Sequence, residues 1–378
     1  LTFDTSLKIL IPISIIIIPS FLSLFFAIPV YLLSFFHKFK NFNLILIFSL
    51  ILGIFEFIRG HILTGFPWNL FIYSLSNNTS YIQMTSFLGT YGLNLITITF
   101  FLIPAILFLK KTKYELILSF VFFSIFFLFF LIGESRINEQ GKISKNQKNF
   151  QIKIISSNID IKRFYDSSKE DEIIDEMIKI SNPEKDIPTL FIWPEGTLTS
   201  TYLKDIDRYK TFFKRFSKKH LILFGINDLK EDDNLKIYNS LVIVDNELNI
   251  KALYHKNDLV PFGEFLPIES ILNKIGLRSI TNNYLSFSEG DRRDIININN
   301  NDFKLNILPL ICYEIIYSGK LSKNNNYDLI INISEDGWFG KSIGLHQHFV
   351  HSVFRAIEEG KSIIRSSNNG ISAIIDPK

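Results

Sequence analysis

The apolar residues of this chain are concentrated before residue 134, in long runs that carry almost no charge. A bilayer core of about 30 Å requires roughly 20 apolar residues in a helix, and the runs are long enough, or nearly so, to cross it. The predicted spans are Ile9–Phe36, Phe42–Ile58, Phe87–Leu109 and Leu116–Gly133. Residues 1–134 are therefore predicted to form an α-helical transmembrane bundle.

Lysines in the short connections predict how the spans are oriented. Basic residues lie between the first two spans and again between the last two: His37, Lys38, Lys40, Lys110, Lys111 and Lys113. Short loops rich in lysine stay in the cytoplasm, and with four spans both clusters fall on the same side. The residues after 134 are therefore expected outside the cytoplasm.

The pattern changes after residue 150, where short β-rich runs alternate with amphipathic helical stretches. Several of the predicted strands are apolar at consecutive positions, which is typical of sheets covered on both faces. Residues 150–378 are therefore predicted to form a layered α/β domain, and 297–301 a polar turn. The strands are expected at 152–155, 189–193, 221–224, 240–244, 304–311 and 329–333, and the helices at 169–181, 204–217 and 343–359.

Composition and charge narrow the possible functions. Hydrophobic residues make up 47% of the 378 residues, and the net charge of +3 arises from basic and acidic residues that are mixed along the chain. No nucleic-acid partner is therefore expected. A single cysteine excludes an internal disulfide. Glu56 and Arg59, three residues apart at the end of the second span, predict an ion pair near the membrane interface.

Three residues are the candidates for chemistry. Glu195 follows a predicted strand, Lys256 precedes a segment with two prolines and a glycine, and Cys312 ends an apolar strand. Together they predict a nucleophilic site, in which Glu195 acts as general base, Cys312 attacks a carbonyl and Lys256 stabilises the oxyanion. Amides at a helix N-terminus and a nearby ammonium would favour the thiolate. Glu264 and Glu314 are candidates to orient Lys256 or the base, and a covalent thioester is expected.

A metal site is the alternative reading of the histidines near the C-terminus. His346, His348 and His351 are spaced i, i+2, i+5, which does not put all three on one helical face. We expect neither a metal nor a cofactor.

The motifs resemble the apolipoprotein N-acyltransferase family, the membrane-attached branch of the carbon-nitrogen hydrolase (nitrilase) superfamily. The resemblance covers about residues 42 to 376 and is carried by Thr64–Trp68, Trp193–Gly196, His255–Pro267, Ile311–Glu314, Gly337–Gly340, Gln347–Phe349 and Arg365–Gly370.

The resemblance implies a nitrilase-like αββα sandwich on the periplasmic side of the bacterial inner membrane. It assigns Glu195 as base, Lys256 as oxyanion stabiliser and Cys312 as nucleophile, and it places Glu264, Tyr313 and Glu314 close to the active site or the substrate. The implied reaction moves an acyl chain from a phosphatidylethanolamine-like phospholipid to Cys312. It then passes the chain to the α-amino group of the diacylglyceryl-cysteine of a lipoprotein.

Two positions depart from the family pattern. Ser156 stands where the family usually has a glutamine, and Glu335 stands in a Ser-Glu-Asp segment that is usually Ser-Asn-Asp. The family also has further spans before the first one here and a last span after the domain, so the chain is expected to be incomplete.

Two other functions fit the same residues. A membrane-anchored nitrilase-type amidase would use the same three side chains with water as the acceptor. A receptor or scaffold would keep the domain without catalysis, but the presence of Glu195, Lys256 and Cys312 together argues against it.

Overall fold

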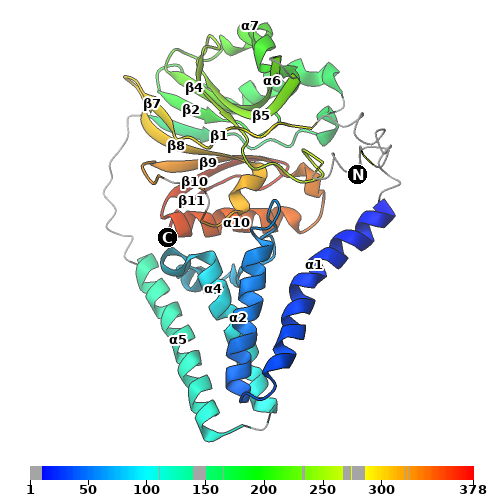
Figure 1. Cartoon of the computed structure of the whole chain (residues 1–378). Coiled ribbons are helices and arrows are strands. Elements are labelled where there is room, and N and C mark those ends of the chain that lie inside the picture. The colour runs from blue at the N-terminus through cyan, green and yellow to red at the C-terminus, as the bar shows by residue number, and fades with distance from the viewer. Residues whose placement is uncertain are drawn as a thin grey trace. The chain divides into compact units, whose positions relative to one another are not determined.

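A computed structural model of the chain describes residues 11–109, 111–138, 150–164, 166–231, 235–266, 274, 286–319, 321–322 and 324–378. The chain divides into two compact units (Figure 1). The membrane unit comprises residues 1–142 and 268–284 with Lys378, and the sandwich unit comprises residues 143–267 and 285–377. The start of the first predicted span, Ile9 and Leu10, and the loop residue Lys110 lie outside the described residues.

The membrane unit is helical. Among the described residues, four helices are long and apolar enough to cross a membrane, and the chain is a membrane protein. Their bounds are α1 Ile11–Leu33 continued by η2 Ser34–Phe36, α2 Asn41–Arg59, α4 Thr85–Leu102 continued by η4 Ile103–Phe108, and α5 Lys113–Asn138; η3 Phe71–Leu75 and α3 Thr79–Ile82 lie between α2 and α4. All four predicted spans are confirmed as helices.

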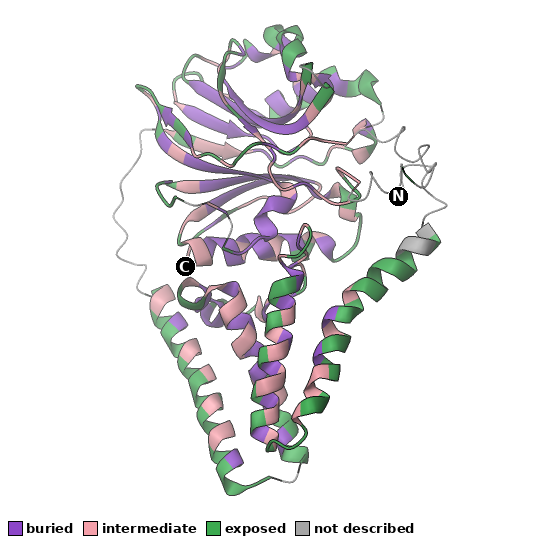
Figure 2. Ribbon diagram, viewed as in Figure 1, coloured by how far each residue is buried: buried purple, intermediate pink, exposed green. Residues whose placement is uncertain are grey.

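The outer faces of these helices are apolar and exposed, as surfaces in contact with lipid should be. Figure 2 shows exposed and half-buried positions along most of α1 and α5, and Phe120 is 73% exposed. In contrast, the predicted ion pair between Glu56 and Arg59 is confirmed at 3.3 Å and is buried. Asn94 of α4 also donates to Glu56, so the pair links α2 to α4.

The sandwich unit contains two mixed sheets. In the first, the strand order is β1-β2-β4-β5-β6 with β3 beside β4, and in the second it is β11-β10-β9-β8-β7. The first sheet consists of β1 Gln151–Ile154, β2 Thr189–Ile192, β3 Leu198–Tyr202, β4 His220–Glu231, β5 Leu235–Val244 and β6 Ile250–His255. The second consists of β7 Ile296–Asn299, β8 Lys304–Ile311, β9 Leu329–Glu335, β10 Ser362–Asn368 and β11 Ala373–Ile375.

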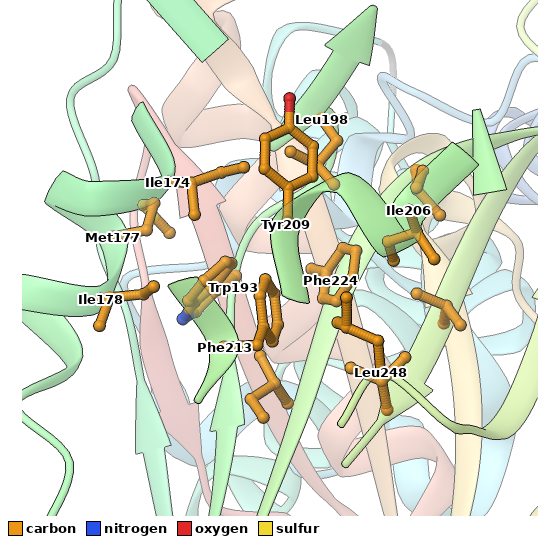
Figure 3. Close-up of a cluster of buried hydrophobic side chains, with 14 of the residues drawn as sticks. Ile174, Met177, Ile178, Trp193, Leu198, Ile206, Tyr209, Phe213, Phe224 and Leu248 are labelled. Atoms are coloured by element: carbon orange, nitrogen blue, oxygen red, sulfur yellow. The ribbon is translucent and has the colours of Figure 1, made fainter. Parts of the chain in front are cut away.

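The two sheets pack face to face, and helices cover their outer sides (Figure 1). In β2, Leu190 and Ile192 lie in the core between the sheets. Phe191 and Trp193 belong instead to a second core. Figure 3 shows Trp193 within it. This second core is covered by α6 (Glu170–Ser181) and α7 (Lys210–Phe213), and α10 (Gly344–Glu359) lies on the outer side of the second sheet. The predicted αββα sandwich is therefore confirmed, as is the reason for its consecutively apolar strands.

Two predicted elements are only partly confirmed. Asn297 and Asn299 belong to β7 rather than to a turn, because Ile296 and Ile298 alternate with them and reach the core between the sheets. The helix expected at 204–217 is instead a 3-10 helix, η8 (Leu203–Tyr209), followed by the short α7. In η8 every third residue is buried, namely Leu203, Ile206 and Tyr209, and this spacing matches the period of a 3-10 helix.

Candidate active site

Glu195 lies in the loop that leaves β2, and the core anchors its backbone. Trp193 is fully buried beside the rings of Phe213 and Phe224 (Figure 3), with ring centroids 5.7 and 5.9 Å away. On the other side of the loop, Gly225 of β4 comes so close that a Cβ there would lie 2.8 Å from Cα of Glu195. A larger residue at 225 would displace the loop, so Gly225 helps to set the position of Glu195.

The Glu195 carboxylate is buried but fully hydrogen-bonded. Oε1 accepts from Asn239 Nδ2 at 2.8 Å, and Oε2 accepts from the backbone N–H of Glu335 at 2.9 Å. Nζ of Lys256 lies 3.7 Å from Oε1. Burial raises the pKa of Glu195; Lys256 lowers it, while the carboxylates of Glu264 and Glu335 raise it, and the net direction is upward. A carboxylate with a raised pKa is suited to act as a general base near neutral pH.

Lys256 follows β6 and is only 1% exposed. Its ammonium donates to Oε1 of Glu264 at 2.8 Å, and its backbone is fixed by hydrogen bonds to Asn239 and Gly290. Burial lowers the pKa of Lys256, but Glu264 and Glu195 outweigh it, so the net shift is upward. The side chain is therefore a fixed positive charge inside the site.

Asn239 was missed by the sequence reasoning. Its Nδ2 group donates to Glu195 at 2.8 Å and to Glu264 at 2.9 Å, and so it holds the two carboxylates around Lys256. The only signal in the sequence is a polar residue within the apolar strand β5, just before Ser240. A polar residue inside a strand is too common to identify a site.

Cys312 stands at the turn between β8 and the 3-10 helix η9 (Cys312–Ile316). Its φ of 50° lies in the left-handed region, which is strained for a residue with a side chain. Its carbonyl oxygen lies within hydrogen-bonding distance of Asn332 Nδ2 (3.4 Å) and His348 Nε2 (3.3 Å). These contacts hold the residue in a conformation that the isolated chain would avoid.

A buried polar network supports that turn from behind. His348 Nδ1 lies 2.8 Å from Oδ1 of Asp336, and Arg365 donates to Oδ2 of Asp336 at 2.8 Å. All three side chains are at most 1% exposed. His348 therefore serves this network, and the described residues include no group of His, Cys, Asp and Glu that could hold a metal ion.

The surroundings of Cys312 raise the pKa of its thiol, whereas the sequence predicts surroundings that favour the thiolate. Burial raises the pKa of Cys312, and Glu195 and Asp336 raise it further, while Lys256 lowers it. One ammonium does not outweigh burial and two carboxylates, and η9 is too short to contribute a substantial dipole. A neutral thiol needs a base before it can attack, and Glu195 lies close enough to change its pKa.

Three further residues were expected to support the site: Glu264, Glu314 and Tyr313. Glu264 contacts Lys256 directly, as described above. Glu314 is fully buried and accepts from the backbone N–H groups of Ile311 at 2.7 Å and Asn257 at 2.9 Å. Glu314 therefore links Ile311, which precedes Cys312, to Asn257, which follows Lys256. Tyr313 is buried, with burial raising its pKa to about 12.

Glu314 also neutralises a buried arginine. Arg293 Nη2 donates to Oε1 of Glu314 at 2.8 Å, and Tyr254 Oη donates to the same oxygen at 2.6 Å. Burial raises the pKa of Glu314, but Arg293 and these hydrogen bonds outweigh it and lower the pKa. Glu314 is therefore an ionised anchor, whereas Glu195 is a carboxylate with a raised pKa in the same unit.

Comparison with known proteins places this arrangement in a family. Residues 2–103 match the Apolipoprotein N-acyltransferase N-terminal domain, and residues 191–378 match the Carbon-nitrogen hydrolase domain. A carbon-nitrogen hydrolase superfamily protein from Xanthomonas campestris aligns over 60% of this chain and 82% of its own, with 16% identity and a TM-score of 0.40.

Curated relatives match over nearly the whole chain. The apolipoprotein N-acyltransferase of Rhodopseudomonas palustris is 30% identical over 97% of this chain and 70% of its own length. That of Rickettsia prowazekii is 36% identical over 91% of this chain and 68% of its own length. With a membrane unit, a nitrilase-like sandwich and relatives of this extent, the chain belongs to the apolipoprotein N-acyltransferase family.

Proposed function

We propose that this chain transfers an acyl chain from a phospholipid, through a thioester on Cys312, to the α-amino group of the diacylglyceryl-cysteine at the start of a lipoprotein. The observation that carries the proposal is the buried ammonium of Lys256, which lies 3.7 Å from Glu195 and affects the pKa of Cys312. Membership of the family supports the choice of donor and acceptor.

The first half of the reaction forms the thioester. Glu195 takes the proton of the Cys312 thiol as the sulfur attacks the carbonyl carbon of the phospholipid ester. Lys256 stabilises the negative charge that develops on the carbonyl oxygen. The bond to the glycerol oxygen then breaks, Glu195 returns the proton to that oxygen, and the lysophospholipid leaves.

The second half passes the acyl group on. The α-amino group of the acceptor attacks the thioester carbon, and Glu195 takes a proton from the attacking nitrogen. The bond to sulfur breaks, an amide forms, and the proton returns to Cys312. Lys256 stabilises the oxyanion in both halves, because the same carbonyl oxygen carries the charge each time.

The reaction also fits the membrane character of the chain. A phospholipid donor and a lipid-anchored acceptor both reside in the bilayer, and the chain has helices able to span one. We propose the bacterial inner membrane as its location, with the sandwich unit on the periplasmic side. Lysines at the N-terminal ends of α2 and α5 support this orientation: Lys38 and Lys40 precede α2, and Lys111 and Lys113 lie where α5 begins.

An acyl-transfer assay with the full chain tests the proposal. We expect acyl transfer to a synthetic diacylglyceryl lipopeptide from vesicles of phosphatidylethanolamine with a labelled acyl chain. A lipopeptide with an acetylated α-amino group is the matched control and should accept nothing, because its nitrogen is no longer nucleophilic. Release of ammonia from a small amide, without any transfer to the free amine, would contradict the proposal and favour an amidase.

A further inference from the structure

Arg163 and Glu335 form an ion pair that is buried beside Glu195. Arg163 belongs to the 3-10 helix η6 (Ile161–Phe164), and Glu335 is the last residue of β9. They are 4% and 1% exposed, and Nη2 of Arg163 donates to Oε2 of Glu335. A buried ion pair is tolerated only when its remaining donors and acceptors are also satisfied.

That condition is met on both sides of the pair. Oε1 of Glu335 accepts from the N–H of Gly337 at 2.8 Å, and Oε2 also accepts from Asn368 Nδ2 at 2.7 Å. Nη1 of Arg163 donates to the carbonyl oxygen of Asp160 at 3.3 Å. Both side chains are therefore held in one arrangement.

Each member of the pair also holds one side of Glu195. The backbone N–H of Glu335 donates to Oε2 of Glu195 at 2.9 Å. Nε of Arg163 donates to the carbonyl oxygen of Gly196 at 3.0 Å, where the chain turns with a φ of 59°. The loop after β2 comes from the first sheet and β9 from the second, so the ion pair fastens the two sheets together at the proposed base.

We propose that the Arg163–Glu335 pair is a positioning device, which holds the carboxylate of Glu195 in the orientation needed to receive the proton of Cys312. Glu335 contacts the carboxylate of Glu195 through its backbone N–H, and Arg163 contacts the carbonyl oxygen of Gly196, so both act through Glu195. The inference rests on the proposed role of Glu195 as base.

The charges of Arg163 and Glu335 predict how substitution of each residue should change the pKa of Glu195. The charged and titratable groups around Glu195 come from several elements: Lys256, Glu264, Glu335, Cys312 and, behind Glu335, Arg163. Glu335 raises the pKa of Glu195. Because Arg163 pairs with Glu335, its positive charge is expected to offset that effect. Arg163→Gln should therefore raise the pKa of Glu195, Glu335→Gln should lower it, and the double variant should return it close to its original value.

Alkylation of Cys312 by iodoacetamide measures this without any substrate. The chain has one cysteine, so the rate on the purified full chain reports that thiol alone. The rate should rise first as Glu195 loses its proton and again at higher pH as the thiol itself ionises. Glu195→Gln should remove the first rise and leave the second, and the first rise is the one compared among the variants. The rise should move up by roughly one pH unit in Arg163→Gln and down by roughly one in Glu335→Gln. The double variant should resemble the unmodified chain.

The outcomes separate this inference from the proposed function. If Glu195→Gln removes the rise but both single variants leave its position unchanged, or move it in the same direction, the positioning role is wrong and the base assignment stands. If Glu195→Gln has no effect, the base assignment fails and the positioning role fails with it. Arg215→Gln, which breaks an exposed ion pair with Asp175, is the matched control and should not move the profile. If Arg163→Gln does not fold, Glu335→Gln and the double variant decide.

Discussion

Cys312→Ala is expected to reduce acyl transfer to the lipopeptide by roughly 10⁴-fold or more, because no other thiol in the chain can form the covalent intermediate. The strained turn at 312 is stabilised through its carbonyl contacts with Asn332 and His348, which an alanine keeps. The variant should therefore fold, and the loss should appear in the rate of transfer.

Cys312→Ser is the sharper companion to this variant. A serine hydroxyl has the size to fit the site, but it is a far weaker nucleophile than a thiol at the same position. We expect it to melt near the temperature of the unmodified chain and still to lose most of its activity. Transfer at an undiminished rate by either variant would show that the reaction proceeds without a thioester.

Lys256→Met should have two separate effects, on activity and on stability. Removal of an oxyanion stabiliser typically lowers kcat by about 10² to 10³-fold. The change also leaves Glu195 and Glu264 buried without their ammonium partner. Loss of one partner from a buried ion pair destabilises a protein by about 3 to 5 kcal/mol. A lower melting temperature and a lower transfer rate should therefore appear together.

A second substitution separates these effects. Lys256→Met with Glu264→Gln removes one negative charge along with the positive one, so stability should recover in part. Activity should not recover, because the oxyanion still lacks its ammonium. If activity instead follows the melting temperature across the two variants, the lysine is a structural partner of the carboxylates and has no catalytic role.

Much of the fold was predictable because its signals are local or periodic. The membrane helices are marked by the length of their apolar runs. β2 is marked by the consecutive apolar residues Leu190–Ile192, which are all buried in the structure. Failures occurred where tertiary packing decides: β7 contains two asparagines that face solvent, and η8 follows a period of three.

The site divides in the same way. Glu195, Lys256 and Cys312 stand in distinctive motifs, whereas Asn239 and Arg163 lie in unremarkable sequence and reach the site only through the fold. The direction of the pKa shift of Cys312 was predicted wrongly from its neighbours in sequence. Its pKa depends on burial and on Glu195 and Asp336, which are distant along the chain. These features depend on which side chains the two sheets bring together.

The most direct test of the account is the intact mass of the full chain after incubation with vesicles of one defined phosphatidylethanolamine. We expect an added mass equal to one acyl chain, located on the peptide that contains Cys312 and removed by neutral hydroxylamine, which cleaves thioesters. Absence of any adduct on a folded chain that transfers acyl groups, or an adduct on another residue, would contradict it.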